Sequence, residues 1–357
     1  MKEEIARNHP ELRFAYSRPG FVTYRLPKSV DIWGMFQLRS VFARTWGISL
    51  GPVQGKTGED RMLTVLQHAR ELGVNRIHIW QRDQFGPGHH GYEPGLTDTA
   101  RRTRLRMAEL APRRGEPKSG WFEGPTIRGH HVLDCILVDT NRWYLGCHVA
   151  REPSTCWTGG MWLHPLPTHA INRAWIKMDE ALAWSRLPIQ EGQVCAEIGC
   201  APGGASQRLL QAGLNVIGID PAIVDESVLG HPNFTHLRKR GTEVRRKEFR
   251  DVHWLMADMN VTPNYTLDTI EGIVSHPEVN IAGMLLTLKL VDWKLAREIP
   301  GYLDRIRSWG FSHVQARQLH HNRQDFCVAV QRTKRQRRRP VRKTKSSRDR
   351  PHRVDVF

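Results

Sequence analysis

The sequence lacks any apolar run near the ~20 residues that a helix needs to cross a bilayer, so no membrane association is expected. Its first residues, MKEEIARNHPELRF, lack the apolar stretch of a secretory signal peptide. The six cysteines form no CxxC pair, so they indicate neither a disulfide framework nor a zinc site, and no metal is expected. These absences favour reduced thiols in a cytoplasmic protein.

The positive charge is unevenly distributed along the chain. The 357 residues carry a formal net charge of +17, and residues 331–357, with 12 Lys or Arg and 2 Asp, contribute +10 of it. Because this segment has no apolar periodicity, residues 333–357 are predicted to be a disordered basic tail. Such a tail would tether the protein to nucleic acid through salt-dependent contacts. A solvated tail that aids solubility is the simpler alternative.

Residues 1–165 are predicted to form an α+β module. Strands are expected at residues 21–26, 75–80 and 130–149, the last a pair with a turn near 140–141, and helices at 36–46, 61–72 and 97–110. The last helix is basic, and its arginines could meet phosphates or face solvent. The Gly/Pro/His-rich segment 84–95 is expected to be a flexible loop, because no carboxylate or cysteine completes a metal site beside its histidines.

Residues 166–332 have a different pattern. Strand-like runs such as VCAEIGC, NVIGID, VHWLMAD, GMLLTLKL and FCVAV alternate with helix-like runs such as SQRLLQAG and IPGYLDRIRSWG. This alternation is typical of a parallel sheet with crossover helices, and nearly continuous apolar strands indicate that helices cover both faces. The predicted fold is therefore α/β and Rossmann-like, joined to the first module through the Pro-containing segment 164–175.

A glycine-rich loop follows the first strand of this half. The strand ends near Ile198 and a helix starts near Ala205, with Gly-Cys-Ala-Pro-Gly-Gly at 199–204 between them. Glycine lets the backbone approach a ligand closely, and ligands of open parallel sheets bind at the carboxyl ends of the strands. The alternative is a tight strand-to-helix turn without a ligand.

An acid at the end of the next strand favours the ligand. Asp220 ends NVIGID about 20 residues after the glycine loop, where a carboxylate can accept hydrogen bonds from the vicinal hydroxyls of a ribose. This geometry suits a nucleoside cofactor, either a dinucleotide or S-adenosylmethionine (AdoMet). The motif GxGxxG is absent, which disfavours NAD.

Three charged residues complete the candidate site. Asp258 ends a predicted central strand, Lys289 lies in or at the end of an apolar run, and Lys177 precedes the predicted helix MDEALAW. An unpaired cation in an apolar run is costly, and a buried lysine beside another cation can have a lowered pKa and act as a base. Taken singly, each residue is explained as well by an ion pair or a snorkelling side chain.

These residues carry a resemblance to a known family. The second half resembles the FtsJ-type 2′-O-ribose RNA methyltransferases, with GCAPGG similar to their AdoMet loop and QARQLHHNRQDFCVAV similar to their C-terminal end. It is most similar to the bacterial branch that modifies a cytidine of large-subunit rRNA. FARTW and EDRM loosely resemble the THUMP-containing, ferredoxin-like RNA-binding module of that branch. The resemblance covers residues 20–332 and implies an AdoMet-dependent methyltransferase that acts on RNA, expected to be rRNA.

The resemblance also assigns the site. The loop residues Gly199, Ala201, Pro202, Gly203 and Gly204, with Asp220 and Asp258, are implied to bind the cofactor.

The family's Lys-Asp-Lys-Glu tetrad maps to Lys177, Asp258, Lys289 and Gln324. Gln324 departs from the pattern, and the adjacent Asp325 could supply the carboxylate only if the alternation of strand side chains allowed it. The hypothesis is that Lys289 is the base, Asp258 holds it, and Gln324 helps to position the ribose or a lysine.

A second departure is Arg240, where the family usually has an acid at the adenine end of the cofactor. Two alternatives to an active RNA methyltransferase therefore stay open. One is an RNA-binding protein that keeps the fold but has weakened catalysis. The other is a small-molecule or protein methyltransferase with the same fold.

Overall fold

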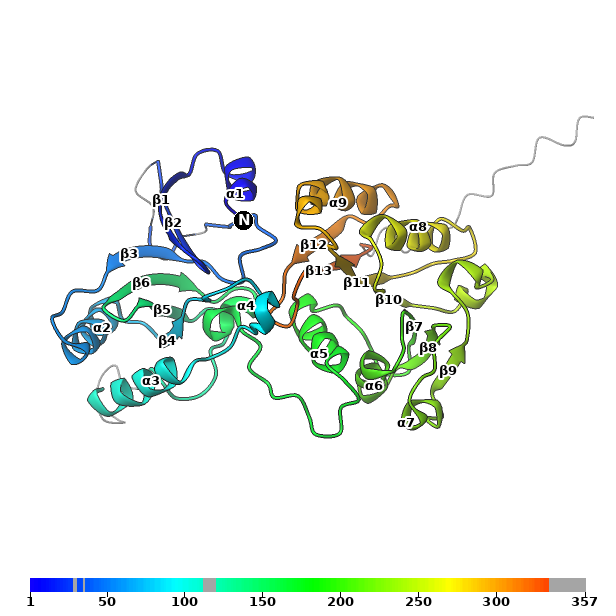
Figure 1. Cartoon of the computed structure of the whole chain (residues 1–357), viewed down its shortest axis with the longest axis horizontal. Helices are drawn as coiled ribbons and strands as arrows, with labels where there is room; N and C mark the ends of the chain where they lie inside the picture. The colour runs from blue at the N-terminus through cyan, green and yellow to red at the C-terminus, as the bar shows by residue number, and fades with distance from the viewer. Residues whose placement is uncertain (28–30, 35, 112–119, 334–357) are drawn as a thin grey trace, which may run out of the picture.

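The computed structural model describes residues 1–27, 31–34, 36–111 and 120–333. Apart from Thr333, the predicted basic tail lies outside the described residues. Figure 1 shows two halves side by side, one from the blue end of the chain into green and one from green to orange. The proposed division at residue 165 and the limits 166–332 stay predictions.

The N-terminal half is built on a four-stranded sheet in the order β3-β6-β5-β4. Its strands are β3 (Ile48–Pro52), β4 (Arg76–Gln81), β5 (His131–Asp139) and β6 (Arg142–Val149), and only the β4–β5 pair is parallel. The helices α2 (Gly58–Leu72) and α3 (Asp98–Leu110) pack on one face. The expected α+β class is found, with the order β-α-β-α-β-β, whereas a ferredoxin-like module has β-α-β-β-α-β.

The other face of this sheet is covered by a hairpin and by the turn at residues 158–161. Strands β1 (Arg13–Arg18) and β2 (Phe21–Arg25) form the hairpin, which follows helix α1 (Lys2–Asn8). Phe21 and Met161 are buried there against Trp80 and Ile136 of the sheet. Both faces of the sheet are therefore enclosed, as its apolar strands require.

The helix predicted over residues 36–46 is wrong. The described part of this segment is irregular, and its backbone binds partners distant in sequence. Glu4 accepts a hydrogen bond from the backbone N–H of Val41 at 2.6 Å, and the carbonyl oxygen of Val41 accepts from Gln318 at 2.7 Å. Val41 is buried in the core of the C-terminal half. Helical spacing of its apolar residues was misleading. These residues do not form the buried face of a helix but belong to an irregular segment that connects the two halves.

The C-terminal half contains a seven-stranded sheet in the order β12-β13-β11-β10-β7-β8-β9, in which β13 alone runs antiparallel. Its strands are β7 (Val194–Ile198), β8 (Asn215–Ile219), β9 (Phe234–Leu237), β10 (Trp254–Asp258), β11 (Gly283–Lys289), β12 (His313–Arg317) and β13 (Asp325–Gln331). This mixed sheet confirms the α/β, Rossmann-like prediction. The strand order reverses between β7 and β10, which is where open α/β sheets bind ligands.

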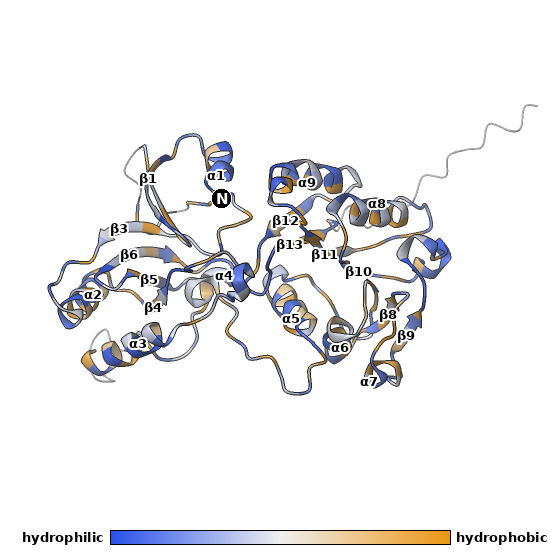
Figure 2. Cartoon of the chain, viewed as in Figure 1, coloured by the Kyte–Doolittle hydropathy of each residue, from blue (hydrophilic) through white to orange (hydrophobic). Residues whose placement is uncertain are grey.

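Helices cover both faces of this sheet. On one face lie α5 (Ala174–Ser185) and α6 (Gly204–Gln211), and on the other α8 (Pro263–Val274) and α9 (Ile299–Ser308). The short helices α4 (Pro153–Cys156) and α7 (Glu226–Leu229) complete the chain's α-helices in its described part. In Figure 2, apolar and polar residues alternate along α2 and α8, as in helices with one buried face. Within the described residues, no helix combines the length and apolarity that crossing a bilayer requires.

The two halves are joined by buried polar contacts. Arg317, at the end of β12, donates to the hydroxyl of Ser154 and lies 3.3 Å from a carboxylate oxygen of Glu152. Its guanidinium also lies over the ring of Trp46, 4.9 Å from the ring centroid. Arg317 is only 7% exposed, so it needs these partners from the N-terminal half.

We predict that Leu286→Ala, in the middle of β11, destabilises the protein by about 2–5 kcal/mol, because Leu286 is fully buried and its truncation leaves a cavity. Leu105→Ala is the matched control. Leu105 is 60% exposed on α3, so its loss should change the free energy of unfolding by less than about 0.5 kcal/mol. Urea denaturation measures both. Equal effects of the two substitutions would contradict the position of β11 in the core.

Candidate active site

The predicted site residues gather at one edge of the C-terminal sheet. The glycine loop follows β7, Asp220 follows β8, Asp258 ends β10 and Lys289 ends β11. These strands are parallel, so their carboxyl ends meet at the same edge. The antiparallel strand β13 begins at this edge, which brings its first residue, Asp325, to the site.

The glycine loop packs closely against its surroundings. Gly199 has φ +84°, and a Cβ there would lie 2.6 Å from the carbonyl oxygen of Asp258. Gly203 has φ +122°, and a Cβ on Gly204 would lie 2.0 Å from the side-chain oxygen of Asn172. Any side chain at Gly199 or Gly204 would therefore displace a neighbour, so the loop requires glycine for its conformation and its close approach.

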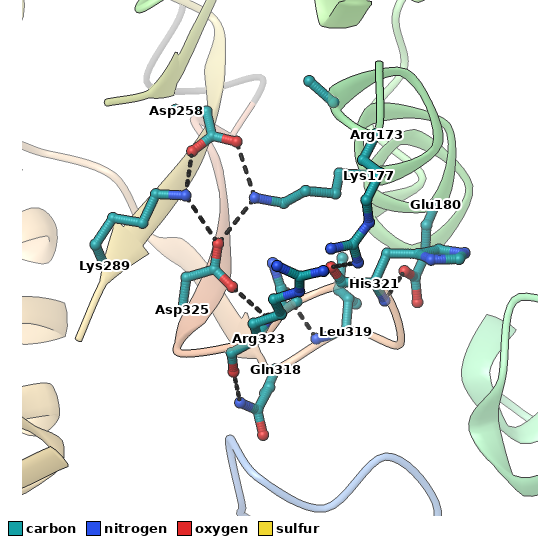
Figure 3. A network of polar contacts seen from close by, with 12 residues as sticks. Arg173, Lys177, Glu180, Asp258, Lys289, Gln318, Leu319, His321, Arg323 and Asp325 are labelled. Atoms are coloured by element: carbon teal, nitrogen blue, oxygen red, sulfur yellow. Dashed lines mark hydrogen bonds and ion pairs between the residues drawn. The ribbon is translucent and has the colours of Figure 1, made fainter. Parts of the chain in front are cut away.

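Four charged side chains form a compact network, shown in Figure 3. The Lys177 amine lies 2.9 Å from one oxygen of Asp258 and 2.8 Å from Asp325. The Lys289 amine lies 2.9 Å from the other oxygen of Asp258 and 3.1 Å from the same oxygen of Asp325. The structure thus brings together the three predicted residues Lys177, Asp258 and Lys289, which lie far apart in the sequence. With Asp325 they form a network of two basic and two acidic side chains.

Asp325, and not Gln324, supplies the fourth member of this network. In the pairing of β11 with β13, Asp325 lies directly opposite Lys289. Gln324 precedes the strand, and its carbonyl oxygen accepts a hydrogen bond from Leu290 at 2.8 Å. Since successive residues of a strand point to opposite faces, only one of the two side chains can face the lysines. The placement of Gln324 in the tetrad is corrected, and the site keeps a carboxylate.

The charges in the network stabilise one another. Burial alone would lower the pKa of Lys177, but the carboxylates of Asp258 and Asp325 outweigh it and raise that pKa above its usual value. Burial would raise the pKa of each carboxyl group, but the two lysines hold both pKa values below their usual range. Lys177 is therefore a charged member of the network, and the two carboxylates lie between it and Lys289 as partners of both amines.

Helix α5 begins before Lys177, so this lysine lies in its first turn and not ahead of the helix as predicted. One turn later on the same helix lies Glu180, which is 1% exposed. Its two carboxylate oxygens accept hydrogen bonds from the backbone N–H groups of His320 and His321 at 2.7 and 2.9 Å. Burial raises the pKa of Glu180 to about 7 although both hydrogen bonds lower it.

Glu180 thereby fixes the loop that presents Asp325. This catalytic loop, residues 318–324, also carries the backbone N–H of Arg323, which donates to Asp325 at 2.7 Å. The side chain of Gln318 donates to the carbonyl oxygen of Arg323 at 2.6 Å. Our sequence analysis missed Glu180, although an acid among the apolar residues of MDEALAW was a signal for a buried carboxylate with partners.

The N-terminal half contacts the same loop. Glu93 lies 2.9 Å from Arg173 and 2.5 Å from Arg323, and the carbonyl oxygen of Pro94 lies 2.7 Å from a ring nitrogen of His320. The other ring nitrogen of His320 lies 3.0 Å from the carbonyl oxygen of Trp162. The segment 84–95 was predicted to be a flexible loop. Its end is instead docked on the catalytic loop.

Glu197 is a second acid that sequence analysis missed. It lies in β7, is 2% exposed and accepts a hydrogen bond from the hydroxyl of Ser206. Burial raises the pKa of Glu197 to about 8. The hydrogen bond from Ser206 lowers this pKa, and the negative charge of Asp258 raises it further. Glu197, Lys177 and Asp258 line one small cavity. An acid inside the apolar strand VCAEI was the available signal.

Two further predicted positions lie at the rim. The carboxylate of Asp220 accepts hydrogen bonds from the backbone N–H groups of Ala222 at 2.8 Å and of Ala201 at 3.2 Å, which ties β8 to the glycine loop. Arg240 is exposed, and its backbone N–H donates to the carboxylate of Glu243 at 2.9 Å. An acid therefore lies beside the position where the family pattern expects one.

No group of three or more His, Cys, Asp or Glu side chains is arranged to hold a metal ion in the part of the chain that the structure describes. All six cysteines are free thiols.

Residues 170–349, half of the chain, match the FtsJ-like methyltransferase family. The chain belongs to this family. The matched residues include the glycine loop and the charged network. The family resemblance inferred from GCAPGG and the C-terminal strand is confirmed.

Named relatives extend the similarity beyond this domain. "Ribosomal RNA large subunit methyltransferase M" of Actinobacillus succinogenes is 23% identical over 81% of this chain and 81% of its own length. The protein of the same name from Methylococcus capsulatus is 28% identical over 80% of this chain and 78% of its own length. That of Laribacter hongkongensis is 29% identical, but the match spans only 49% of this chain and 52% of the relative.

We predict that Asp325→Ala lowers the rate of methyl transfer by at least about 100-fold, because two lysines would then share one carboxylate. Gln324→Ala is the matched control and should stay near the wild-type rate. Single-turnover kinetics with labelled methyl donor measures both. A larger loss for Gln324→Ala than for Asp325→Ala would contradict the corrected tetrad.

We predict that Glu197→Gln flattens the pH dependence of stability. With a folded pKa of about 8 against an ordinary value of 4.5, folded Glu197 holds a proton that the unfolded chain has lost. The contribution of Glu197 to stability is therefore fully present below about pH 4.5 and is lost as pH rises from there to about 8. Urea denaturation at about pH 5.5 and about pH 7.5 should show a smaller difference for the variant. Glu226→Gln, at an exposed position, should behave like the wild type.

Proposed function

We propose that this protein transfers the methyl group of AdoMet to a ribose 2′-hydroxyl of RNA, with large-subunit rRNA as the substrate. The observation that carries the proposal is the network of Lys177, Asp258, Lys289 and Asp325 at the carboxyl edge of the sheet, next to the glycine loop. A hydroxyl is a weak acid and needs a positioned proton acceptor, and at this edge we assign that role to the amine of Lys289.

The residues at the edge fit AdoMet. The backbone of residues 199–204 is free of side chains at its closest points, and the carboxylate of Asp220 keeps acceptor capacity for ribose hydroxyls beyond its two backbone hydrogen bonds. Gly199, Ala201, Pro202, Gly203 and Gly204 would hold the cofactor together with Asp220 and Asp258. When bound, AdoMet supplies a methyl group that is already activated on a sulfonium.

The chain's own residues then orient the acceptor and remove its proton. Lys289 is 22% exposed and lies at the end of its strand, so its amine can reach a substrate hydroxyl and accept the proton when it is uncharged. Asp258 and Asp325 hold this amine in one place, and Lys177 balances their charge. Methyl transfer requires that the protein align the hydroxyl with the methyl group more than that it form covalent bonds. The network of ion pairs provides this alignment by holding the amine in place.

RNA as the substrate is supported by two features of the chain. The relatives that match four-fifths of it carry the name rRNA large subunit methyltransferase. The formal charge of +17 favours a polyanionic partner, and most of it lies in the segment that follows the methyltransferase fold. We infer that the N-terminal half selects the RNA and that the protein acts in the cytoplasm. The basic tail would add affinity without sequence preference.

The alternative of a catalytically weakened protein rested on Gln324 and Arg240. Asp325 supplies the carboxylate that Gln324 lacks, and Glu243 lies beside Arg240, so neither residue favours that alternative. Titration calorimetry with AdoMet distinguishes an active methyltransferase from a catalytically weakened RNA-binding protein, since the weakened protein should bind the cofactor poorly. A small-molecule acceptor is disfavoured by the basic charge.

We predict that Lys289→Ala reduces ribose methylation of rRNA by about 100-fold or more while its affinity for AdoMet changes little. Mass spectrometry of large-subunit rRNA from a deletion strain, complemented with each variant, locates and quantifies the methylated ribose. Lys247→Ala is the matched control, because Lys247 is exposed near the amino end of the sheet. Unaltered rRNA in the deletion strain, or full methylation by Lys289→Ala, would refute the proposal.

A further inference from the structure

The segment 84–95 of the N-terminal half lies directly beside the catalytic loop. In Figure 1 this cyan segment sits between the two halves, next to the orange loop that leads into β13. A Cβ on Gly88 would lie 3.1 Å from the side chain of Arg323, whose own backbone N–H binds Asp325. Glu93 pairs with Arg323 and with Arg173. The segment therefore forms part of the surroundings of the active site.

This segment presents a group of aromatic rings to solvent. Phe85 is 47% exposed, and His89 and His90 are exposed as well. The rings of Phe85 and His89 are stacked, with centroids 6.0 Å apart and an interplanar angle of 24°, and the His90 ring lies 4.1 Å from that of His89. Scattered exposed aromatics need no explanation, but three adjoining rings beside a catalytic loop do.

The backbone holds these rings in a defined position. Gly88 has φ +79° and donates to the carbonyl oxygen of Tyr92 at 2.7 Å, and His89 donates to that of Gly86 at 3.0 Å. The hydroxyl of Tyr92 donates to Asp83 at 3.1 Å, and Asp83 in turn pairs with Arg44 at 2.8 Å. A platform that is already ordered loses little conformational entropy when a ligand stacks on it.

The charge and the space around the rings fit a nucleic acid. Arg173 and Arg323 share the single carboxylate of Glu93, which leaves one positive charge in excess beside the rings. Phe85 also lines a cavity of about 510 Å³, and Leu319 lines both this cavity and the small cavity beside Lys177 and Asp258. This volume falls within the range of roughly 300–1,000 Å³ that small-molecule sites span.

We propose that Phe85 and His89 form a stacking platform for an unpaired base of the substrate RNA, next to the nucleotide whose ribose is methylated. This inference rests on the proposed function and names how the acceptor strand is held. Proteins that bind single-stranded RNA stack splayed bases on aromatic rings and pair the backbone with arginine, and both groups adjoin the catalytic loop here. The contact would also explain why the two halves share one active site.

The test compares two ligands that differ only in their bases. Fluorescence anisotropy measures the affinity of the full chain for a labelled single-stranded RNA of about 12 nucleotides and for an abasic strand of equal length. The double variant Phe85→Ala/His89→Ala should bind the RNA roughly ten-fold more weakly, as expected for one lost base stack, and the abasic strand as the wild type does. Its AdoMet affinity and melting temperature should not change.

Two further variants separate stacking from charge and from general effects. His89→Phe keeps an aromatic ring but removes the imidazole nitrogens, so it should retain the affinity for RNA. His313→Ala removes an exposed histidine at the opposite edge of the sheet, where β12 begins, and should have no effect. Equal losses on both strands, no loss on either, or a loss with His89→Phe as large as with alanine would overturn the platform.

The outcome is distinguishable from failure of the proposed function. If the wild-type chain leaves rRNA unmethylated, the proposed function fails, and the comparison of RNA with the abasic strand still tests the platform. If rRNA is methylated but the double variant binds both strands normally, the platform alone is wrong.

Discussion

The need to pair charges at the carboxyl edge of the sheet is the constraint on which the rest of the site depends. Lys177, Asp258, Lys289 and Asp325 come from a helix and three strands, and each is largely withdrawn from water. The side chains need one another as partners, because an isolated buried charge is far more costly than a paired one. The network therefore fixes where α5 and β13 begin relative to the ends of β10 and β11.

The N-terminal half belongs to this arrangement and is more than an attached module. Glu93, Pro94 and Trp162 contact the catalytic loop, and Glu180 of helix α5 binds its backbone. Figure 3 shows Arg173 beside this loop, Arg323 within it and Asp325 at its end. Because a shift of about 1 Å in a catalytic group can cost a large part of the rate, such anchoring would support the proposed reaction.

The sequence by itself determined the C-terminal fold and most of its site. Alternating apolar strands and helices predicted the parallel sheet, and parallel strands place Asp220, Asp258 and Lys289 at one edge whatever the details of packing. Glycines at 199 and 203–204 indicated a closely packed backbone, and a Cβ on Gly199 or Gly204 would lie 2.6 or 2.0 Å from a neighbouring protein atom. These predictions succeeded because strand direction and backbone sterics are local properties that a short motif reveals.

Only the tertiary structure decided which carboxylate completes the network and what the segments outside the sheets do. Gln324 and Asp325 are neighbours in sequence, and the pairing of β13 with β11 selects Asp325. Helical spacing at 36–46 and the flexible appearance of 84–95 were both misleading, because partners more than 200 residues away, such as Gln318 and His320, hold parts of these segments in place. Such long-range contacts leave no periodic trace in the sequence, since they depend on how two separately folded halves meet.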